Sequence, residues 1–250
     1  MNEPNAVTIS NLSRHFGNFR AVDNISLEVM RGETFGFLGA NGAGKTTTIR
    51  MLCGLLAPTS GTGEVAGLDI YRQAEEIKKS IGYMSQKFSL YPDLTGGENL
   101  SFYGAAYGMN KTAIRSRVAE LTDRLNLGEF IDRPTGSLPV GWRQRLALGV
   151  SLLHQPKILF LDEPTSGVDP VFRRRFWQVL YELAEEGVTV FVTTHYMDEA
   201  EYCGRISIMH QGRIVEVGQP FELVSRHRAE NLEELFINLI KRQDEVNAEA

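Results

Sequence analysis

The sequence contains little cysteine and no long apolar stretch. Cys53 and Cys203 are the two cysteines among 250 residues, and their spacing matches no metal-ligand pattern. Such sparse cysteine is typical of reduced thiols in a cytosolic protein. No uninterrupted apolar run approaches the ~20 residues that a membrane-spanning helix needs, so we expect any membrane association to come through a partner. The polar, acidic residues 1–4 predict no signal peptide.

An excess of positive charge is also missing. Lys and Arg number 26 against 31 Asp and Glu, which gives a formal net charge of −5. This balance offers no electrostatic case for binding nucleic acid. The apolar fraction of 42% is ordinary for a globular protein, and 250 residues suffice for one large domain or for a domain with an inserted lobe.

The most informative stretch that is present is Gly39–Thr47, which reads G-x-x-x-x-G-K-T. These fixed positions would arise by chance in roughly one chain in a hundred, so the surroundings decide its meaning. Residues 31–39 form a short apolar run that predicts a buried strand, and residues 45–56 have the apolar spacing of a helix. A strand, a glycine-rich turn and a helix are the setting of a phosphate-binding loop.

Each residue type in this loop has a physical role toward a nucleotide. The glycines adopt backbone conformations closed to other residues, so that main-chain N–H groups and the helix N-terminus meet phosphate oxygens. Lys45 would neutralise the terminal phosphates, and the Thr46 hydroxyl would ligate Mg²⁺. The alternative, a ligand-free turn, has no use for a Lys-Thr pair at this position.

Carboxylates follow a second apolar run at residues 157–164. A continuous apolar run is typical of a parallel strand buried on both faces, and open α/β sheets place their sites at the carboxyl ends of such strands. Asp162 would hold Mg²⁺ through water, and Glu163 would orient or deprotonate an attacking water. Alone, the pair would be interpreted as a helix cap, but together with the phosphate loop it favours catalysis.

A third apolar run, at residues 188–195, ends in His195. A single histidine at a strand end is more often a hydrogen-bonded structural residue than a catalytic one. Because it follows a phosphate loop and an acid-tipped strand in this order, we favour a contact with the γ-phosphate.

The rest of the chain changes character twice. Residues 7–10 and 25–29 alternate apolar and polar, as half-exposed antiparallel strands do. Between about residues 88 and 150 helical spacing dominates, as at 111–127, which predicts a helical lobe inserted into an α/β core. Residues 232–240 carry an apolar stripe that we expect to dock on the parent domain. We therefore predict a single domain over residues 1–240 and a polar tail over 241–250 that frays.

These elements, taken in order, resemble the ATP-binding subunit of an ABC transporter over nearly the whole chain. The order is the phosphate loop, Gln86 after a strand, the helical lobe, and then residues 143–146, 159–165, 166–169 and His195. The resemblance implies an α/β fold: a P-loop NTPase core with a mixed sheet, an N-terminal antiparallel β subdomain and the inserted helical lobe. It also implies ATP and Mg²⁺ as cofactors.

The resemblance assigns roles to individual residues. Catalysis is assigned to Glu163 and His195, and the metal to Thr46, Gln86 and Asp162. Phe16 matches the aromatic that stacks on adenine, although a core aromatic is an equal alternative. The predicted ATP-binding residues are Phe16, Gly39, Ala40, Asn41, Gly42, Ala43, Gly44, Lys45, Thr46, Thr47 and Gln86.

The chain departs from the family at the signature loop, where Leu138–Trp142 stands for Leu-Ser-Gly-Gly-Gln. In the family this loop contacts the ATP of the other subunit, so the implied trans-ATP contacts are Pro139, Val140, Gly141 and Asp169. The hydroxyl is lost and proline has no N–H, which would cripple the contact. We favour the alternative that the contact with the other subunit's ATP is kept. Pro139 would then occupy the first helical position, and the amides of Val140, Gly141 and Trp142 would point at phosphate.

The predicted function is a cytosolic, Mg²⁺-dependent ATPase that powers export through a separate membrane permease. The residues near 194–200 and 232–236 resemble the exporter branch that serves six-span permeases for drugs or polysaccharides, and residues 91–95 stand where the family contacts the permease. A second ATP-binding subunit is implied, as is a peripheral place on the inner face of the cell membrane. Alternatives are a regulatory module with weak or no hydrolysis, a soluble ABC protein acting on ribosomes or DNA, and a small-molecule kinase. The sequence specifies neither the exported substrate, nor the permease, nor whether the two ATP-binding subunits are identical.

Overall fold

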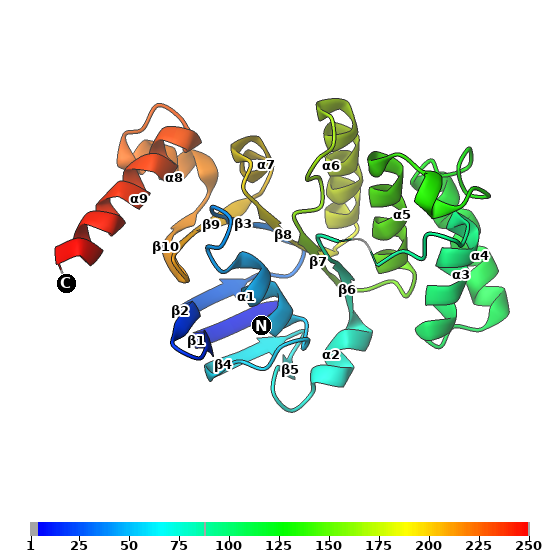
Figure 1. The fold of residues 1–250 in the computed structure, drawn as a ribbon, viewed down its shortest axis with the longest axis horizontal. Helices are drawn as coiled ribbons and strands as arrows, with labels where there is room; N and C mark the ends of the chain where they lie inside the picture. The colour runs from blue at the N-terminus through cyan, green and yellow to red at the C-terminus, as the bar shows by residue number, and fades with distance from the viewer. Residues whose placement is uncertain (1–4, 88, 250) are drawn as a thin grey trace.

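The computed structural model describes residues 5–87 and 89–249, with the side chains from 246 onward left out. Its centre is a six-stranded sheet in the order β10-β9-β3-β8-β7-β6 (Figure 1). All neighbours in it pair in parallel except β10 and β9, which are antiparallel, so the predicted mixed sheet is confirmed. The strands are β3 (Thr34–Leu38), β6 (Ile81–Met84), β7 (Ile158–Asp162), β8 (Thr189–Thr194), β9 (Arg205–His210) and β10 (Arg213–Gly218).

A second, antiparallel sheet has the order β2-β1-β4-β5 and confirms the predicted N-terminal β subdomain. It comprises β1 (Val7–Phe16), β2 (Phe19–Val29), β4 (Ser60–Val65) and β5 (Leu68–Asp69). Helix α1 (Lys45–Leu52) contacts β2 and β4 of this sheet and β7 of the central one, so it lies between the two (Figure 1). It is shorter than predicted, because the chain turns at Gly54, where φ is +68°.

Side-chain alternation in the central strands divides the core into two parts. Phe160 of β7 and Phe191 of β8 lie on the face toward α1, with ring centroids 5.3 Å apart. Leu159 and Val190 lie on the other face, which helices from residues 140–152 and 170–249 cover. Asp162, two residues beyond Phe160, therefore points to the α1 side, whereas Thr194 at the end of β8 points to the opposite side.

The helical lobe forms one end of the molecule, at the right of Figure 1, within the predicted range apart from its last turn. It contains α3 (Gly96–Ala106), α4 (Lys111–Arg124) and α5 (Val140–Leu152). The short helix η1 (Thr135–Ser137) precedes α5, and the short helix α2 (Ala74–Ser80) precedes β6. Local sequence explains the starts of two of these helices. Thr95 and Glu98 form a capping box at α3, and the Asn110 side chain accepts from the Ala113 amide at α4.

The C-terminal helices cover the remaining face of the sheet. They are α6 (Pro170–Glu185), α7 (Met197–Glu201), α8 (Pro220–His227) and α9 (Leu232–Glu249). The predicted docking of the apolar stripe is confirmed, because Leu232, Leu235 and Leu239 of α9 are buried. Helix α9 continues to Glu249, past residue 241 where we predicted a fraying tail, and the side chains from 246 to 250 lie outside the described residues.

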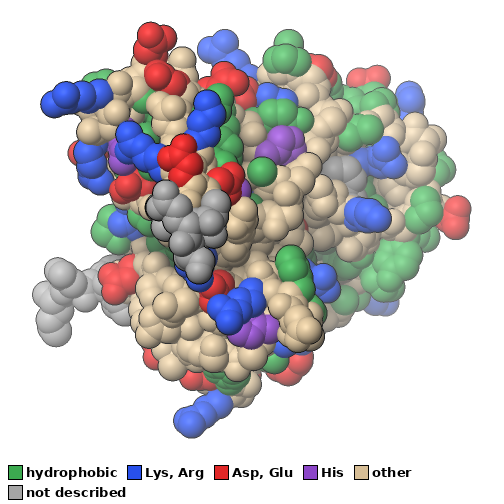
Figure 2. All heavy atoms as spheres, turned by 60° about the vertical axis from the view of Figure 1, so that its left-hand side comes forward, with side chains coloured by type: hydrophobic (Ala, Val, Ile, Leu, Met, Phe, Trp, Pro, Cys, Tyr) green, Lys and Arg blue, Asp and Glu red, His purple; other side chains and the backbone are tan. Residues whose placement is uncertain are grey.

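Surface features of the C-terminal end are mixed in charge. Figure 2 shows basic and acidic side chains interspersed on the face that carries α8 and α9, and neither sign dominates there. Across the part of the chain that the structure describes, no helix has the length and apolar character to cross a membrane.

Candidate functional site

The phosphate loop connects β3 to α1 in the predicted conformation. Gly42 and Gly44 have φ values of +82° and +108°, which other residues rarely adopt. A Cβ at Gly44 would lie 2.5 Å from the Ala21 carbonyl oxygen, so this position also needs glycine for space. Gly44 is the N-cap of α1, and the first bond of the helix runs from the Thr48 amide to the Gly44 carbonyl. The amides of residues 45–47 therefore point out of the helix with no acceptor among the described residues, ready for an anion.

Lys45 lies almost fully buried at the base of this loop. Its Nζ donates to the carbonyl oxygens of Gly39 (2.7 Å) and Ala40 (3.0 Å) and lies 3.4 Å from Glu163 Oε1. Burial lowers the pKa of Lys45 and the Glu163 carboxylate opposes that shift. A buried ammonium held by two neutral carbonyls and one carboxylate is a strong site for additional negative charge, such as phosphate.

Asp162 connects the phosphate loop to two strands. Its Oδ1 accepts from Thr46 Oγ1 (3.0 Å) and from Thr193 Oγ1 (2.7 Å), which stands beside it in the parallel register of β7 and β8. Burial raises the pKa of Asp162, and the two hydroxyl donors oppose the shift. The prediction did not include Thr193, because only the strand pairing reveals that it faces Asp162.

Glu163 occupies the centre of the site in a strained conformation. Its φ is +48°, uncommon for a residue other than glycine, and its amide donates to the Thr193 hydroxyl (3.0 Å). The turn points the carboxylate back toward the phosphate loop, where Gln86 Nε2 donates to Oε2 (3.1 Å) and His195 Nδ1 lies 3.3 Å from the same oxygen. His195 Nδ1 is within ion-pair distance of Glu163, but it is not aligned for a hydrogen bond.

A cavity of about 310 Å³ opens between these groups. Its lining includes residues 44–47 of the loop, Gln86 and Glu163, together with Phe19 from the start of β2. Phe16 pairs with Phe19 across the β1–β2 turn but does not line the cavity, and the Arg14 guanidinium covers its ring at 4.6 Å. Phe16 is 46% exposed, so the alternative of a core aromatic is wrong, and its predicted contact with adenine stays a prediction.

The signature loop has a different structure from the one predicted. Pro139 is the N-cap of α5, with ψ of 153°, and Val140 rather than Pro139 occupies the first helical position. The Trp142 amide is also used, since it donates to the Pro139 carbonyl oxygen (3.1 Å). Within the described residues only the amides of Val140 and Gly141 are left without an acceptor at this helix start.

Aromatic side chains hold the signature loop in place. Trp142 packs on Phe130 with ring centroids 4.2 Å apart, and the Arg145 guanidinium lies 4.9 Å from its ring. A Cβ at Gly141 would come within 2.7 Å of the Phe172 ring, so glycine is required there for packing. Phe172 belongs to the first turn of α6, whose cap is Asp169.

The predicted trans-ATP residues lie outside the cavity that the phosphate loop lines. Pro139, Val140, Gly141 and Asp169 are all absent from its wall. Asp169 is exposed, and its side chain accepts from the amides of Val171 (3.0 Å) and Phe172 (3.1 Å). Their contact with the nucleotide of a second subunit stays a prediction.

The oxygen atoms of the site are suitable ligands for Mg²⁺. The Thr46 hydroxyl and the Asp162 carboxylate meet directly, and Gln86 uses its Nε2 on Glu163, which leaves its Oε1 free as an acceptor. Hydroxyl, amide and carboxylate oxygens are the hard ligands that Mg²⁺ takes, usually together with phosphate oxygens and water. The residues predicted for the metal therefore fit it.

The sequence model of the family described as "ABC transporter" matches residues 22–166, which contain the phosphate loop, Gln86, the signature loop and both carboxylates. The chain belongs to the ABC transporter family. A second model, for an AAA domain, matches only residues 141–197. The predicted family and the prediction of an ATP-binding subunit with an ABC ATPase domain are confirmed.

Two curated relatives illustrate the similarity. The "Probable multidrug ABC transporter ATP-binding protein YbhF" of Escherichia coli strain K12 is 46% identical over 234 residues, which are 92% of this chain and 40% of that protein. This chain thus spans less than half the length of YbhF. The "Linearmycin resistance ATP-binding protein LnrL" of Bacillus subtilis strain 168 is 37% identical over 229 residues, covering 91% of this chain and 74% of LnrL.

Solved structures give the same fold. CbiO1 of Clostridium perfringens, described as part of the ABC transporter complex cbiONQ, is 29% identical with a TM-score of 0.81 and covers 90% of this chain and 92% of its own. A dimeric ATP-binding cassette in a post-hydrolysis state, bound to ADP and Pi, is 27% identical with a TM-score of 0.78 and covers 85% and 98%. The predicted fold class is confirmed.

Proposed function

We propose that this chain binds and hydrolyses ATP and that hydrolysis powers export through a separate membrane permease. The observation that carries the proposal is the convergence on Glu163 of Lys45, Gln86 and His195, from three separate segments of the chain. A carboxylate beside a phosphate loop, oriented by an amide and an imidazole, is the arrangement of a base for an attacking water. The complete set of side chains disfavours the alternative of a regulatory module.

Phosphates entering the cavity would replace the present partners of Lys45. The ammonium would turn from the carbonyls of Gly39 and Ala40 to the terminal phosphates, joined by the outward amides of residues 45–47. That movement also separates Lys45 from Glu163, which frees the carboxylate to accept a proton from water. His195 would then donate toward the γ-phosphate. A bound Mg²⁺, held by Thr46, Asp162 and Gln86, supplies charge neutralisation of the phosphates.

We infer that a second ATP-binding subunit closes the site. The described residues that line the cavity come from the phosphate loop and from Phe19, Ala21, Gln86 and Glu163, and neither the signature loop nor Asp169 of the same chain is among them. The amides of Val140 and Gly141, at a helix N-terminus, would donate to the γ-phosphate held by the partner subunit. The description of the similar ATP-binding cassette bound to ADP and Pi as dimeric supports the pairing of two such subunits.

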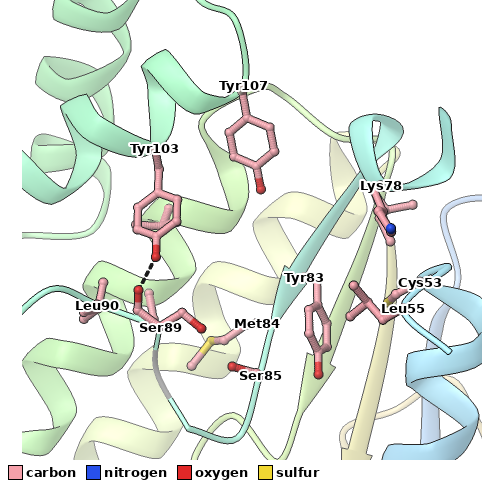
Figure 3. Close-up of a pocket in the computed structure, with 13 residues that line it drawn as sticks. Cys53, Leu55, Lys78, Tyr83, Met84, Ser85, Ser89, Leu90, Tyr103 and Tyr107 are labelled. Carbon is pink, nitrogen blue, oxygen red and sulfur yellow. Dashed lines mark hydrogen bonds between the residues drawn. The ribbon is translucent and has the colours of Figure 1, made fainter. Parts of the chain in front are cut away.

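A groove beside Gln86 is our candidate for the permease contact. It encloses about 330 Å³ between β6, α3 and α5 (Figure 3). The lining is largely apolar, and Ser85 and Ser89 of the segment around Gln86 form part of it. Tyr103 donates from its hydroxyl to the Ser89 carbonyl oxygen, so this segment is tied to the helical lobe. The lining residues are Cys53, Leu55, Lys78, Ile81, Tyr83, Met84, Ser85, Ser89, Leu90, Tyr103, Tyr107, Ala147 and Val150.

An apolar helix of the permease is the occupant that suits this groove. Exposed aromatics continue its rim, since Tyr91 and Phe102 are each 45% exposed and pack edge to face at 4.8 Å. Large exposed aromatics mark protein contacts, and Tyr91 opens the segment 91–95 for which the sequence predicted the permease contact. Movement of Gln86 on ATP binding would thus reach the permease through Ser85, Ser89 and Leu90, which line the groove.

An ATPase assay of the purified chain tests the enzyme, since steady phosphate release that needs Mg²⁺ is expected. ATP binding without turnover would favour the regulatory alternative. Coexpression with a candidate permease, such as one whose reading frame neighbours the gene of this chain, tests the groove. Tyr107→Glu should abolish copurification, whereas Phe221→Glu, at an 83% exposed phenylalanine of α8, should not. Equal copurification of both variants would contradict the docking site.

A further inference from the structure

Glu199 is a buried carboxylate that the mechanism above does not use. It lies in α7, is 1% exposed, and accepts hydrogen bonds from two threonine hydroxyls. Thr165 donates to its Oε1, and Thr194 donates to its Oε2 (2.6 Å). Burial raises the pKa of Glu199 to about 7. An acid in such surroundings costs free energy relative to an apolar residue, so packing alone gives no reason for it.

The two threonines flank the catalytic candidates. Thr165 stands two residues after Glu163, and Thr194 immediately precedes His195. Thr194 also connects to the phosphate loop, because its carbonyl oxygen accepts from the Gly39 amide (3.3 Å), and its hydroxyl accepts from the Tyr196 amide (2.9 Å). One carboxylate therefore joins the loop after β7 to the loop after β8.

Arg173 extends this connection to α6. Its Nε lies 3.4 Å from Glu199 Oε1, its Nη1 contacts Asp198 Oδ2 at 2.8 Å, and its guanidinium covers the Tyr196 ring at 4.3 Å. Arg173 is in the first turn of α6, four residues after the Asp169 cap. The segment expected to meet a second subunit is thus linked through a charged pair to the segment that carries His195.

We propose that Glu199 is a positioning residue that holds Glu163 and His195 in register by fixing Thr165 and Thr194. The role rests on the proposed ATPase function, in which Glu163 must reach the attacking water while His195 reaches the γ-phosphate. A misplacement of about 1 Å at a catalytic group can lower a rate on the order of a hundredfold. The carboxylate is suited to the task because it accepts two hydroxyl donors at once, one from each loop.

Hydrogen exchange measures the positioning itself, without hydrolysis. In Glu199→Ala we expect the amides of residues 163–169 and 193–197 to exchange about tenfold faster or more. Glu199→Gln keeps one carbonyl acceptor, so its exchange rates should lie between those of Glu199→Ala and those of the parent chain. Asp198→Asn is the matched control, because that neighbouring carboxylate also pairs with Arg173 but is exposed and binds neither threonine; it should stay within about twofold.

Steady-state kinetics measures the consequence. Glu199→Ala should lower kcat by about tenfold or more while the Kd for ATP changes by less than about threefold, and Glu199→Gln should restore part of the loss. Unchanged exchange in both Glu199 variants would overturn the proposal, as would unchanged kcat in an active chain. If exchange is faster in the Glu199 variants but the parent chain hydrolyses no ATP, the positioning role of Glu199 stands and the proposed ATPase function is refuted.

Discussion

The nucleotide cavity and the signature loop offer different groups for the proposed hydrolysis of ATP: side chains in the cavity and backbone amides in the loop. In the cavity, side chains carry the chemistry: Lys45, Asp162 and Glu163 are buried and hydrogen-bonded or ion-paired across loops far apart in the sequence. In the signature loop the side chains only pack, and the groups left for a ligand are the amides of Val140 and Gly141. Substitutions should therefore affect the nucleotide cavity and the signature loop differently.

A site made of backbone groups tolerates changes of residue type that leave its backbone in place. Proline at the N-cap and valine at the next position fit a helix start, so the loop keeps its amide donors although the family's serine is missing. A charged hydrogen bond contributes about 1.5–3 kcal/mol, and one such bond from the serine hydroxyl is absent. We therefore expect a functional but slow enzyme.

Removal of a cavity side chain should have the largest effect. Glu163→Gln keeps the shape and the Gln86 contact but removes the base, so kcat should fall at least about a hundredfold while ATP binding changes little. Phosphate release and the binding of a fluorescent ATP analogue measure the two quantities. Hydrolysis at the parental rate would remove Glu163 from the mechanism.

Displacing the signature backbone should have the next largest effect. Gly141→Ala places a Cβ 2.7 Å from the Phe172 ring and should shift the Val140 and Gly141 amides, with kcat about tenfold lower and ATP binding by the single chain unchanged. Gly128→Ala is the matched control, since a Cβ there meets nothing within 4 Å. Equal kcat values for the two variants would show that the signature backbone does not limit turnover.

Restoring the family's signature side chain should have a smaller effect of opposite sign. The double change Pro139→Ser with Val140→Gly returns a hydroxyl and an amide. Turnover should rise by less than about tenfold, because about 1.5 kcal/mol, the lower end for one charged hydrogen bond, corresponds to about tenfold and the amides of Val140 and Gly141 already supply part of the contact. ATPase assays of the double variant and of each single variant measure it. A rate that stays the same would mean that the existing loop is already competent.

The last expected effect is a pH dependence of folding stability rather than a change in turnover, and Glu199, between the loops that follow β7 and β8, causes it. Glu199 keeps its proton to about pH 7 when folded and loses it near its ordinary pKa when unfolded. Between these values the folded chain binds more protons, so its stability falls as pH rises. From about pH 5 to about pH 8, stability relative to Glu199→Gln should drop by about 2–3 kcal/mol. Denaturant unfolding measures this, and a flat difference would contradict the burial of a titrating acid.

Sequence reasoning predicted the local parts of this molecule better than the connections between them. The phosphate loop, the acid-tipped strand and the helix predicted at 111–127 follow from spacing within one segment. The structure contains each, with the helix ending at residue 124. Thr193 beside Asp162, Phe19 in the cavity wall and Glu199 between two threonines depend on which strands pair, which no spacing reveals. The predicted start of α5 was wrong by one residue, because the fixed φ of proline fits the extended backbone of an N-cap as well as the first helical position.

The cavity is proposed to be one half of an ATP site, which the signature loop of another copy of the chain completes. Analytical ultracentrifugation of Glu163→Gln tests it directly, since this variant should bind ATP without consuming it. With ATP and Mg²⁺ we predict a species of twice the 28.0 kDa chain mass, and with ADP a species of 28.0 kDa. A chain that binds ATP yet sediments at 28.0 kDa in both nucleotides would contradict the claim.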